Sequence, residues 1–328
     1  MKKSFLFVGI SLTVGIMLCV LFFVAIARPS SIDFSQHDMQ DFVTPPEINN
    51  NELVRGLYDQ GYIQNPISYG IFSLVSRFSK KFEAGAYRLS KDMSLIELYQ
   101  NLASPYQKYV KIQEGFRREQ IADQFAKTLS WSEGEKNAFL ELSEKSDTDI
   151  DEGVYFPDTY LVSLDENPTN VAKVITAKFN SSVQKPYEEN KTVVNLNTIL
   201  TIASMIQREA AGKRDMPIIS GIMWNRLFNN WPLQIDATIQ YIKGNEKNWW
   251  PRITSDDIRT TDSPYNTYLY KGLPPTPISN PGIAAINAAL HPTKTSCFFY
   301  LHDNWGGFHC SPSYEGHEAN IDRFLAGT

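Results

Sequence analysis

Residues 196–212, LNTILTIASMIQREAAG, constrain the fold most, because their apolar spacing is that of a helix packed along one side. Asn197 is the expected N-cap, and Gly212 is the expected end of the helix. Glu209 follows Ile202 by seven residues and therefore lies on the apolar arc. We expect a carboxylate on a buried helix face. The apolar side chains that share this arc are Ile199, Ile202, Ala203, Met205, Ile206 and Ala210.

Glu209 is the candidate general acid. Burial disfavours the charged form of a carboxyl group and raises its pKa, so that the group can hold a proton near neutral pH. The alternative is a structural carboxylate that reaches water at the helix end or pairs with Arg208, Arg214 or Arg226. A nucleophile is a weaker interpretation, because Ser204 lies on the polar side of the helix without a nearby histidine in the sequence.

Residues 5–27 form an uninterrupted apolar run of 23 residues behind Lys2 and Lys3, which is long enough to span a bilayer. The run predicts a single-pass anchor in the cell (inner) membrane. Residues 1–4 would lie in the cytoplasm, and the chain after the anchor would lie outside it. A cleaved signal peptide ending near residues 25–27 is the alternative.

The 328 residues are enough for two domains, and the mixture of helical and strand patterns predicts an α+β fold. Residues 28–51 contain three prolines and no periodicity, which is typical of a linker or extended segment. Residues 52–165 are expected to form an N-terminal α/β region, and residues 166–328 a mixed α+β catalytic domain. The net charge of -5, without a basic stripe, argues against nucleic acid as a partner.

Two segments inside the N-terminal region resemble each other at an offset of 23 residues. Residues 88–102, RLSKDMSLIELYQNL, and residues 111–125, KIQEGFRREQIADQF, each predict a strand, a polar turn and a helix. This unit resembles half of a LysM module, which in cell-wall proteins binds N-acetylglucosamine. A plain packing module is the alternative. Gly85, in the first strand, predicts a bulge or a close approach.

The second half contains two unusual polar stretches. In residues 231–244 the polar residues Gln234, Asp236 and Thr238 alternate with apolar ones, which predicts the solvent face of a strand or the lining of a polar cleft. Residues 261–282 contain five prolines together with several tyrosines and Asn266. This composition predicts an ordered, irregular loop that offers a sugar-binding surface.

Cys297 and Cys310 flank a predicted β-hairpin. An oxidising exterior would permit a disulfide, but we expect two reduced, buried thiols, since the sequence does not determine the register of the hairpin. The histidines show no tight ligand spacing, and two cysteines thirteen residues apart match no zinc pattern. We therefore expect no metal site.

A series of motifs in residues 52–325 resembles the MltG-type (YceG-like) endolytic murein transglycosylases. They are DEGVYFPDTY, SMIQREA, NRL, LQIDATIQY, SPYNTY, GLPPTPISNPG and YLHDNWGGFHCSPSYEGHEANI, in this order. The resemblance implies cleavage of the β-1,4 bond between N-acetylmuramic acid and N-acetylglucosamine in nascent strands. The products would be 1,6-anhydromuramyl ends, and elongation would stop there. Glu209 matches the family's catalytic glutamate, and neither a second carboxylate, a metal nor an organic cofactor is implied.

The resemblance also implies a substrate-binding set and partners. The expected partners are peptidoglycan glycan strands, together with penicillin-binding proteins and other wall-synthesis enzymes. Arg226 is expected to anchor structure. Two alternatives remain, a hydrolytic muramidase that uses Glu209 with Asp236 and a non-enzymatic peptidoglycan-binding scaffold. The expected substrate-binding residues are Asn225, Gln234, Asp236, Tyr265, Asn266 and Tyr268.

Overall fold

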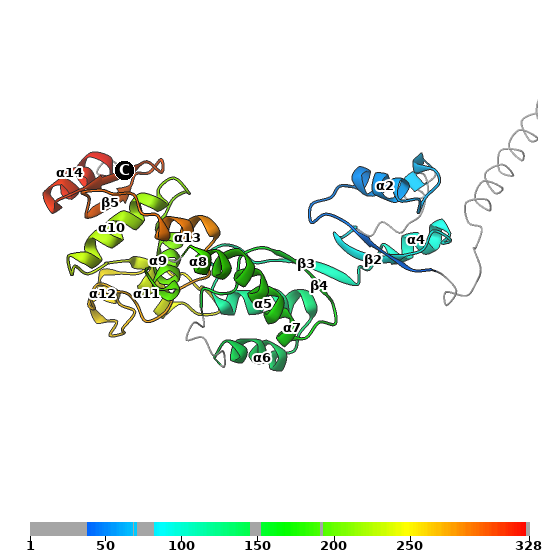
Figure 1. Ribbon diagram of the computed structural model, residues 1–328, viewed down its shortest axis with the longest axis horizontal. Coiled ribbons are helices and arrows are strands. Elements are labelled where there is room, and N and C mark those ends of the chain that lie inside the picture. Colours follow the sequence, from blue (N-terminus) through cyan, green and yellow to red (C-terminus); the bar gives the residue numbers. More distant parts are fainter. Residues whose placement is uncertain (1–37, 68, 71–81, 145–151, 191–192, 326–328) are drawn as a thin grey trace, which may run out of the picture. The chain divides into compact units, whose positions relative to one another are not determined.

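The computed structural model describes residues 38–67, 69–70, 82–144, 152–190 and 193–325 (Figure 1). The chain divides into two compact units, residues 1–109 with 161–164 and residues 110–160 with 165–328. The predicted anchor, residues 5–27, lies outside the described residues. None of the described helices combines the length and the hydropathy needed to cross a bilayer. The predicted domain boundary between residues 165 and 166 stays a prediction.

The first unit is built on a four-stranded sheet with the order β1-β2-β3-β4. In the antiparallel pair β1 and β2, Phe42 lies opposite Tyr87, and both side chains are buried. The chain passes between the units within β3 and β4. The elements are β1 (Gln40–Val43), α2 (Asn50–Asp59), β2 (Gly85–Leu89), α4 (Leu95–Asn101), β3 (Gln107–Lys111) and β4 (Thr159–Ser163).

The repeated strand, turn and helix are confirmed as β2 with α4 and β3 with α5 (Arg118–Leu129). Ser94 begins α4 with a capping box that involves Glu97. The close approach expected at Gly85 is also confirmed, since an added Cβ would lie 2.3 Å from the backbone oxygen of Gln107. The relation to LysM modules stays a prediction.

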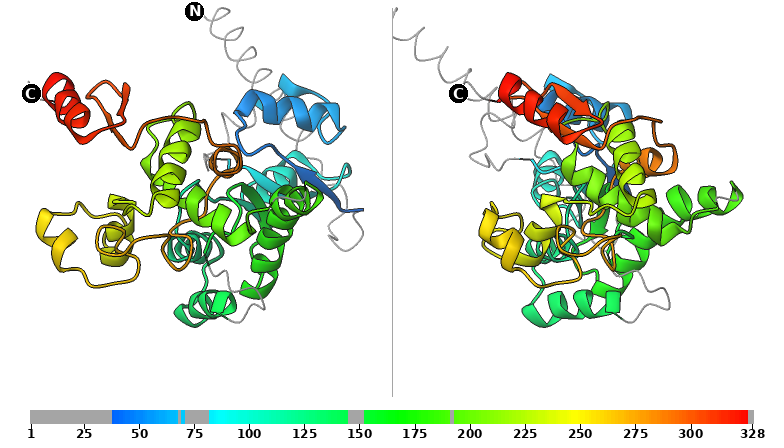
Figure 2. Two further views of the ribbon diagram at one scale, coloured as in Figure 1. Left: turned by 60° about the vertical axis from the view of Figure 1, so that its left-hand side comes forward. Right: turned by 90° about the vertical axis from the view of Figure 1, so that its left-hand side faces the viewer.

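The second unit consists mainly of helices around α9 (Figure 1). Helix α9 packs against α10, α11 and α13, and α14 packs against the hairpin of β5 and β6 (Figure 2). The elements are α6 (Glu133–Glu144), α7 (Pro168–Phe179), η2 (Asn180–Gln184), α8 (Lys185–Glu189), α9 (Leu196–Glu209), α10 (Met216–Phe228), α11 (Asp236–Lys243), α12 (Ser255–Thr260), α13 (Ile283–Leu290), β5 (Phe299–His302), β6 (Phe308–Ser311) and α14 (Tyr314–Phe324).

Helix α9 is buried on all sides, not only on its apolar arc, because residues 199–206 are all buried. Ser204, on the side expected to be polar, accepts a hydrogen bond from the backbone N–H of Ile278 at 3.0 Å. Two expected boundaries were wrong. The N-cap is Asn195, whose side chain accepts from the N–H of Thr198, and the helix ends at Glu209 because the next residue has extended backbone angles.

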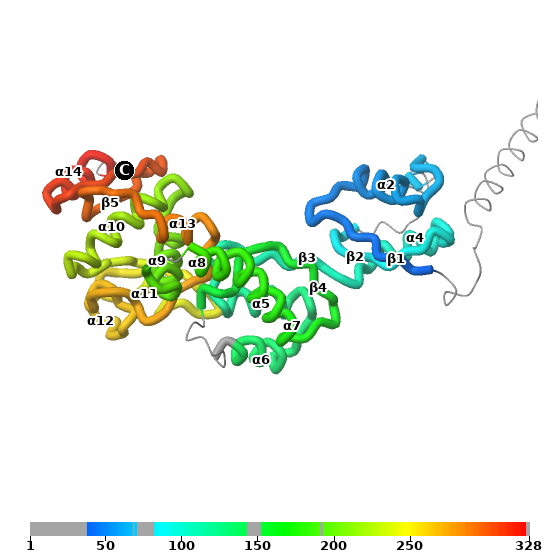
Figure 3. The backbone as a smooth tube through the Cα atoms, in the orientation of Figure 1, coloured from blue at the N-terminus to red at the C-terminus, as the bar shows by residue number. Residues whose placement is uncertain are grey.

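The segment between α12 and α13, residues 261–282, contains no helix or strand, as its prolines predict (Figure 3). Its end is tied to the rest of the second unit by Asn280, which is fully buried. The side-chain oxygen of Asn280 accepts hydrogen bonds at 2.9 Å from the N–H groups of Gly153 and Tyr155. Its amide donates to the backbone oxygen of Phe116 at 3.0 Å and to the carboxyl group of Glu152.

Glu152 is a buried carboxyl group in this network, with 1% of its surface exposed. Its Oε1 also accepts from the N–H of Arg118 at 3.0 Å, whereas Oε2 has no hydrogen-bond partner among the described residues. Burial, reinforced by the charge of Glu119, raises the pKa of Glu152 from 4.5 to about 8. The carboxyl group is therefore largely protonated at neutral pH in the folded protein.

We expect Glu152→Gln to flatten the dependence of stability on pH. Between the unfolded pKa of 4.5 and the folded pKa of about 8, the folded protein keeps a proton that the unfolded chain has released. The free energy of unfolding therefore falls with rising pH, by at most about 1.4 kcal/mol per pH unit from this group. Urea unfolding followed by tryptophan fluorescence from pH 5 to pH 8 measures this slope.

The matched control is Glu189→Gln, which changes an exposed glutamate of α8 in the same unit. This variant is expected to keep the slope of the parent. An unchanged slope in Glu152→Gln would contradict the assignment of a proton to Glu152 at neutral pH.

Candidate active site

Glu209 opens into a cavity of about 310 Å³ in the second unit. Four of the seven residues singled out in the sequence line it, namely Glu209, Gln234, Asp236 and Tyr268. They come from the end of α9, from the start of α11 and the residues just before it, and from the irregular segment before α13. The remaining lining residues are Arg226, Leu233, Phe299, Tyr300, Tyr314 and His317.

The other three expected residues use their polar groups inside the protein and are not among the residues that line this cavity. The amide of Asn225 donates to the backbone oxygens of Thr295 at 2.8 Å and Cys297 at 3.0 Å. The fully buried amide of Asn266 donates to two backbone oxygens and accepts from the N–H of Tyr268. The hydroxyl of Tyr265 bonds that of Thr276. These three side chains position the cavity walls.

The interpretation of residues 231–244 as a strand was wrong, because α11 begins at Asp236. Thr267 holds the two residues before α11 by hydrogen bonds. Its backbone oxygen accepts from the N–H of Gln234, and its hydroxyl accepts from the N–H of Ile235. Gln234 has a φ of +56°, in the left-handed region that is uncommon for residues other than glycine. Gln234 and Asp236 line the cavity, whereas Thr238 is buried.

The expected structural role of Arg226 is confirmed by its hydrogen bonds. Its guanidinium group donates to the backbone oxygens of Phe298 and Leu233, each at 2.7 Å. It also donates to the side-chain oxygen of Gln234 at 3.1 Å. Arg226 thereby ties the segment before α11 to the segment before β5.

The half-buried carboxyl group of Glu209 has a raised pKa. Burial is the main cause, and the nearby charge of Asp236 adds to it. Glu209 is also the last residue of α9, where the negative end of the helix dipole disfavours a second negative charge. The rise in the pKa of Glu209 that was expected from its place on a buried helix face is therefore confirmed.

Two hydrogen bonds act in the opposite direction and stabilise the carboxylate form. The hydroxyl of Tyr300 donates to Oε2 of Glu209 at 2.8 Å, and the backbone N–H of Ala237 donates to the same carboxyl group. Ala237 lies in the first turn of α11, where backbone N–H groups are free and the helix dipole is positive. Glu209 thus lies between the negative end of one helix, which raises its pKa, and the positive end of another, which lowers it.

The sequence did not single out Tyr300, and its position depends on the hairpin. Burial and the negative charge of Glu209 hold the pKa of Tyr300 well above 10, so its hydroxyl remains a donor. Tyr300 pairs across the hairpin with Cys310. The expected hairpin is confirmed, but the expectation of reduced thiols was wrong. Cys297 and Cys310 form a disulfide, because the register brings their Cα atoms to 5.9 Å.

A second pair of groups lies on the cavity wall. Tyr268 donates a hydrogen bond from its hydroxyl to the exposed carboxylate of Asp236. Burial raises the pKa of Tyr268, and the bond to Asp236 raises it further. Burial and the charge of Arg226 lower the pKa of His317, which therefore faces the cavity as a neutral imidazole at neutral pH.

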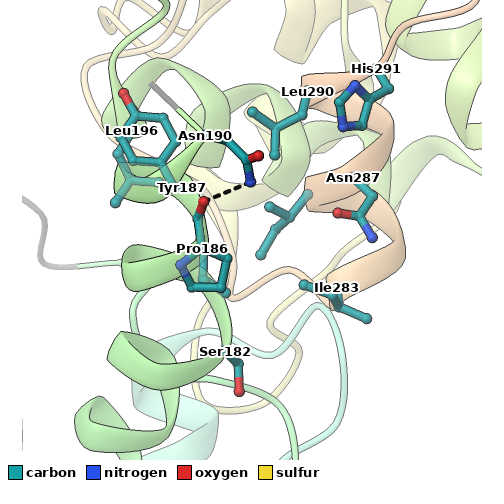
Figure 4. A pocket seen from close by; sticks show the side chains of 11 residues that line it. Ser182, Pro186, Tyr187, Asn190, Leu196, Ile283, Asn287, Leu290 and His291 are labelled. Carbon is teal, nitrogen blue, oxygen red and sulfur yellow. Dashed lines mark hydrogen bonds between the residues drawn. The ribbon is translucent and has the colours of Figure 1, made fainter. Parts of the chain in front are cut away.

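A different cavity of about 310 Å³ lies among η2, α8, α9 and α13 (Figure 4). Its walls are mostly apolar, with contributions from Val183, Leu196 and Ile286. The amide of Asn190 is turned to the backbone oxygen of Pro186, to which it donates at 2.8 Å. None of the described residues that line this cavity carries a carboxylate.

The model of the YceG-like family matches residues 42–323. The chain belongs to the YceG-like family. An endolytic murein transglycosylase of Bacillus subtilis is 32% identical over 269 residues, which are 75% of this chain and 74% of that protein. An endolytic murein transglycosylase of Streptococcus pneumoniae is 25% identical over 317 residues, 84% of this chain and 57% of that protein.

A crystal structure of a YceG-like protein from Listeria monocytogenes has the same fold. It is 24% identical, and the superposition has a TM-score of 0.57 and covers 87% of this chain and 99% of that one. The match to the family model confirms the family resemblance seen in the motifs, and the α+β architecture is shared with this crystal structure.

We expect Tyr300→Phe to raise the pKa of Glu209, because the lost hydrogen bond stabilises the charged carboxylate. A hydrogen bond to a charged group contributes about 1.5–3 kcal/mol, which corresponds to about one to two pKa units. Carbon NMR of glutamate-labelled protein measures the titration, with Glu209→Gln assigning the resonance.

Tyr314→Phe is the matched control, because Tyr314 lines the same cavity and its ring would be kept. This control is expected to leave the titration of Glu209 in place. Equal titration curves for the two variants would contradict the role given to Tyr300.

Proposed function

We propose that this protein is an endolytic murein transglycosylase, which cleaves the β-1,4 bond between N-acetylmuramic acid and N-acetylglucosamine within glycan strands. The observation that carries the proposal is the position of Glu209 in a cavity between α9 and α11, with its pKa raised and with donors ready for its charged form. Membership in a family whose members from Bacillus subtilis and Streptococcus pneumoniae are named for this activity supports the same conclusion.

In the proposed reaction Glu209 acts twice. Its protonated carboxyl group gives the proton to the glycosidic oxygen, which leaves with the N-acetylglucosamine portion as the bond to C1 breaks. The resulting carboxylate then accepts the proton of the C6 hydroxyl of the muramyl residue, whose oxygen bonds to C1 and closes the 1,6-anhydro ring. Water is not consumed, and the carboxyl group ends the cycle protonated.

The surroundings of Glu209 suit both steps. Burial and the end of α9 favour the protonated carboxyl group that begins the reaction. Tyr300 and the N–H of Ala237 stabilise the carboxylate that exists between the steps. Their hydrogen bonds are in place before the proton moves, so little reorganisation is needed.

Asp236 would stabilise positive charge that develops at C1. Its carboxylate is exposed in the same cavity and is oriented by the hydroxyl of Tyr268. The same observation favours a second candidate, a muramidase in which Asp236 assists the attack of water on C1. Glycosidases that hydrolyse their substrate generally use two carboxylates, whereas the transglycosylase reaction needs one.

The proposal includes the cellular context. Residues 5–27 would hold the protein in the cell membrane with the N-terminus in the cytoplasm, and the cavity would act on nascent strands outside it. The disulfide between Cys297 and Cys310 supports this location, since such bonds persist in oxidising compartments. Penicillin-binding proteins and other wall-synthesis enzymes are the proposed partners, and termination of elongation is the proposed role.

We expect Glu209→Gln to abolish the formation of 1,6-anhydromuramyl ends, because an amide can neither donate nor accept the required proton. A positioned acid-base group contributes about 10²–10⁴ in rate, so cleavage is expected to fall by at least about a hundredfold. Mass spectrometry of the products from purified glycan strands measures the formation of these ends. Glu189→Gln, at an exposed position, is the surface control.

The products separate the candidate functions. Anhydromuramyl ends support the transglycosylase, and reducing muramyl ends from the parent protein would establish the muramidase instead. Cleavage by Glu209→Gln at the parental rate would refute both. Strand binding without any cleavage by the parent would indicate a scaffold.

A further inference from the structure

Three aromatic side chains form a continuous patch that begins in the wall of the Glu209 cavity. Phe299 and Tyr314 both line the cavity, and their rings meet edge to face at 5.9 Å. The ring of Trp231 meets Phe299 in the same manner, also at 5.9 Å. We call Trp231, Phe299 and Tyr314 the aromatic ridge.

The outer members of the ridge are open to solvent. Tyr314 exposes 57% of its surface and Trp231 exposes 42%. A single exposed aromatic residue is common on protein surfaces. Here two exposed rings are connected through a third ring to the cavity that holds Glu209, and such a continuous apolar surface is typical of a binding site.

The centre of the ridge is held in place from several sides. The imidazole of His317 stacks on Phe299 at 5.4 Å and 23°, and the guanidinium group of Arg226 lies 5.3 Å from the centre of the same ring. Trp231 also packs on Phe298, with ring centres 4.9 Å apart. Rings that are already held lose little conformational freedom when a ligand binds, which favours affinity.

We infer that the aromatic ridge is a carbohydrate subsite that binds the face of a pyranose ring in the glycan strand, next to the sugars at Glu209. One face of a pyranose ring carries C–H groups and packs well on aromatic rings, whereas its hydroxyl and acetamido groups project from the edge. Polar groups for that edge line the adjoining cavity, among them Gln234 and His317.

The ridge is continuous with the cavity, and this continuity indicates that the ligand on the ridge is the same glycan strand that reaches Glu209. A glycan strand with one linkage beside Glu209 must continue past the mouth of the cavity in at least one direction, since the proposed cleavage is internal to the strand. The ridge provides an apolar surface where the strand leaves. This inference rests on the proposed function. It assigns sugar contacts to the segment between α10 and α11, to the hairpin and to α14, in place of Tyr265.

The test measures binding separately from cleavage. In the full-length chain carrying Glu209→Gln, the dissociation constant for purified, uncrosslinked glycan strands is measured by titration calorimetry. Adding Tyr314→Ala is expected to weaken binding about tenfold, equivalent to about 1.4 kcal/mol. Trp231→Ala is expected to have a similar effect, and Tyr314→Phe, which keeps the ring, is expected to stay within about twofold of its parent.

Trp305→Ala is the matched control. Trp305 lies in the turn of the same hairpin, exposes 87% of its surface and is not among the residues that line the cavity. Its removal is expected to leave strand affinity unchanged. Thermal unfolding of each variant reports whether the fold is kept. If Trp231→Ala fails to fold, Tyr314→Ala, at a more exposed position, still tests the inference.

The outcomes distinguish this inference from the proposed function. If the parent cleaves strands and both ridge variants bind them as tightly as Trp305→Ala does, the ridge is not a subsite. If the parent does not cleave strands but the ridge variants still lose affinity for them, the glycan subsite is supported and the proposed transglycosylase function is refuted. Absence of strand binding by the Glu209→Gln chain would overturn the ridge as a glycan subsite. If the parent forms a dimer and Tyr314→Ala abolishes that dimer, the ridge binds a second copy of the chain, and the inference of a glycan subsite is overturned.

Discussion

The meeting of two helix ends at one carboxyl group is the constraint on which the site depends. Glu209 closes α9, and the first turn of α11 directs the N–H of Ala237 to it. The negative end of α9 favours the protonated form, and the positive end of α11 favours the charged form. This geometry requires α9 to end inside the unit, which explains why the helix is buried on all sides before it reaches Glu209.

Irregular backbone around the cavity is ordered by buried side chains that replace secondary structure. Asn266 and Asn280 each satisfy several backbone groups, and Thr267 holds the two residues before α11. Buried backbone groups must find partners, and a segment rich in proline cannot find them in a helix or sheet. The amide side chains therefore serve as structural ties, and the surfaces open to a sugar come from other elements.

The hairpin of β5 and β6 has a larger part in the site than its position near the chain end suggests. It brings Tyr300 to Glu209 and Phe299 to the cavity wall, and the disulfide closes across it. Arg226 joins this hairpin segment to the start of α11 through backbone oxygens. The acid, its donors and the aromatic ridge are consequently connected within the second unit by hydrogen bonds and ring contacts.

Elements whose signals are local could be predicted from the order of the residues alone. Apolar spacing predicted α9 with Glu209 on a buried face, and turn residues predicted the hairpin. Three features depend on packing between distant segments: Asp236 begins a helix, Cys297 bonds Cys310, and Tyr300 and Ala237 donate hydrogen bonds to the carboxyl group of Glu209. The physical reason is that periodicity specifies which side chains share a face, whereas a hydrogen-bond partner 91 residues away along the chain is chosen by packing.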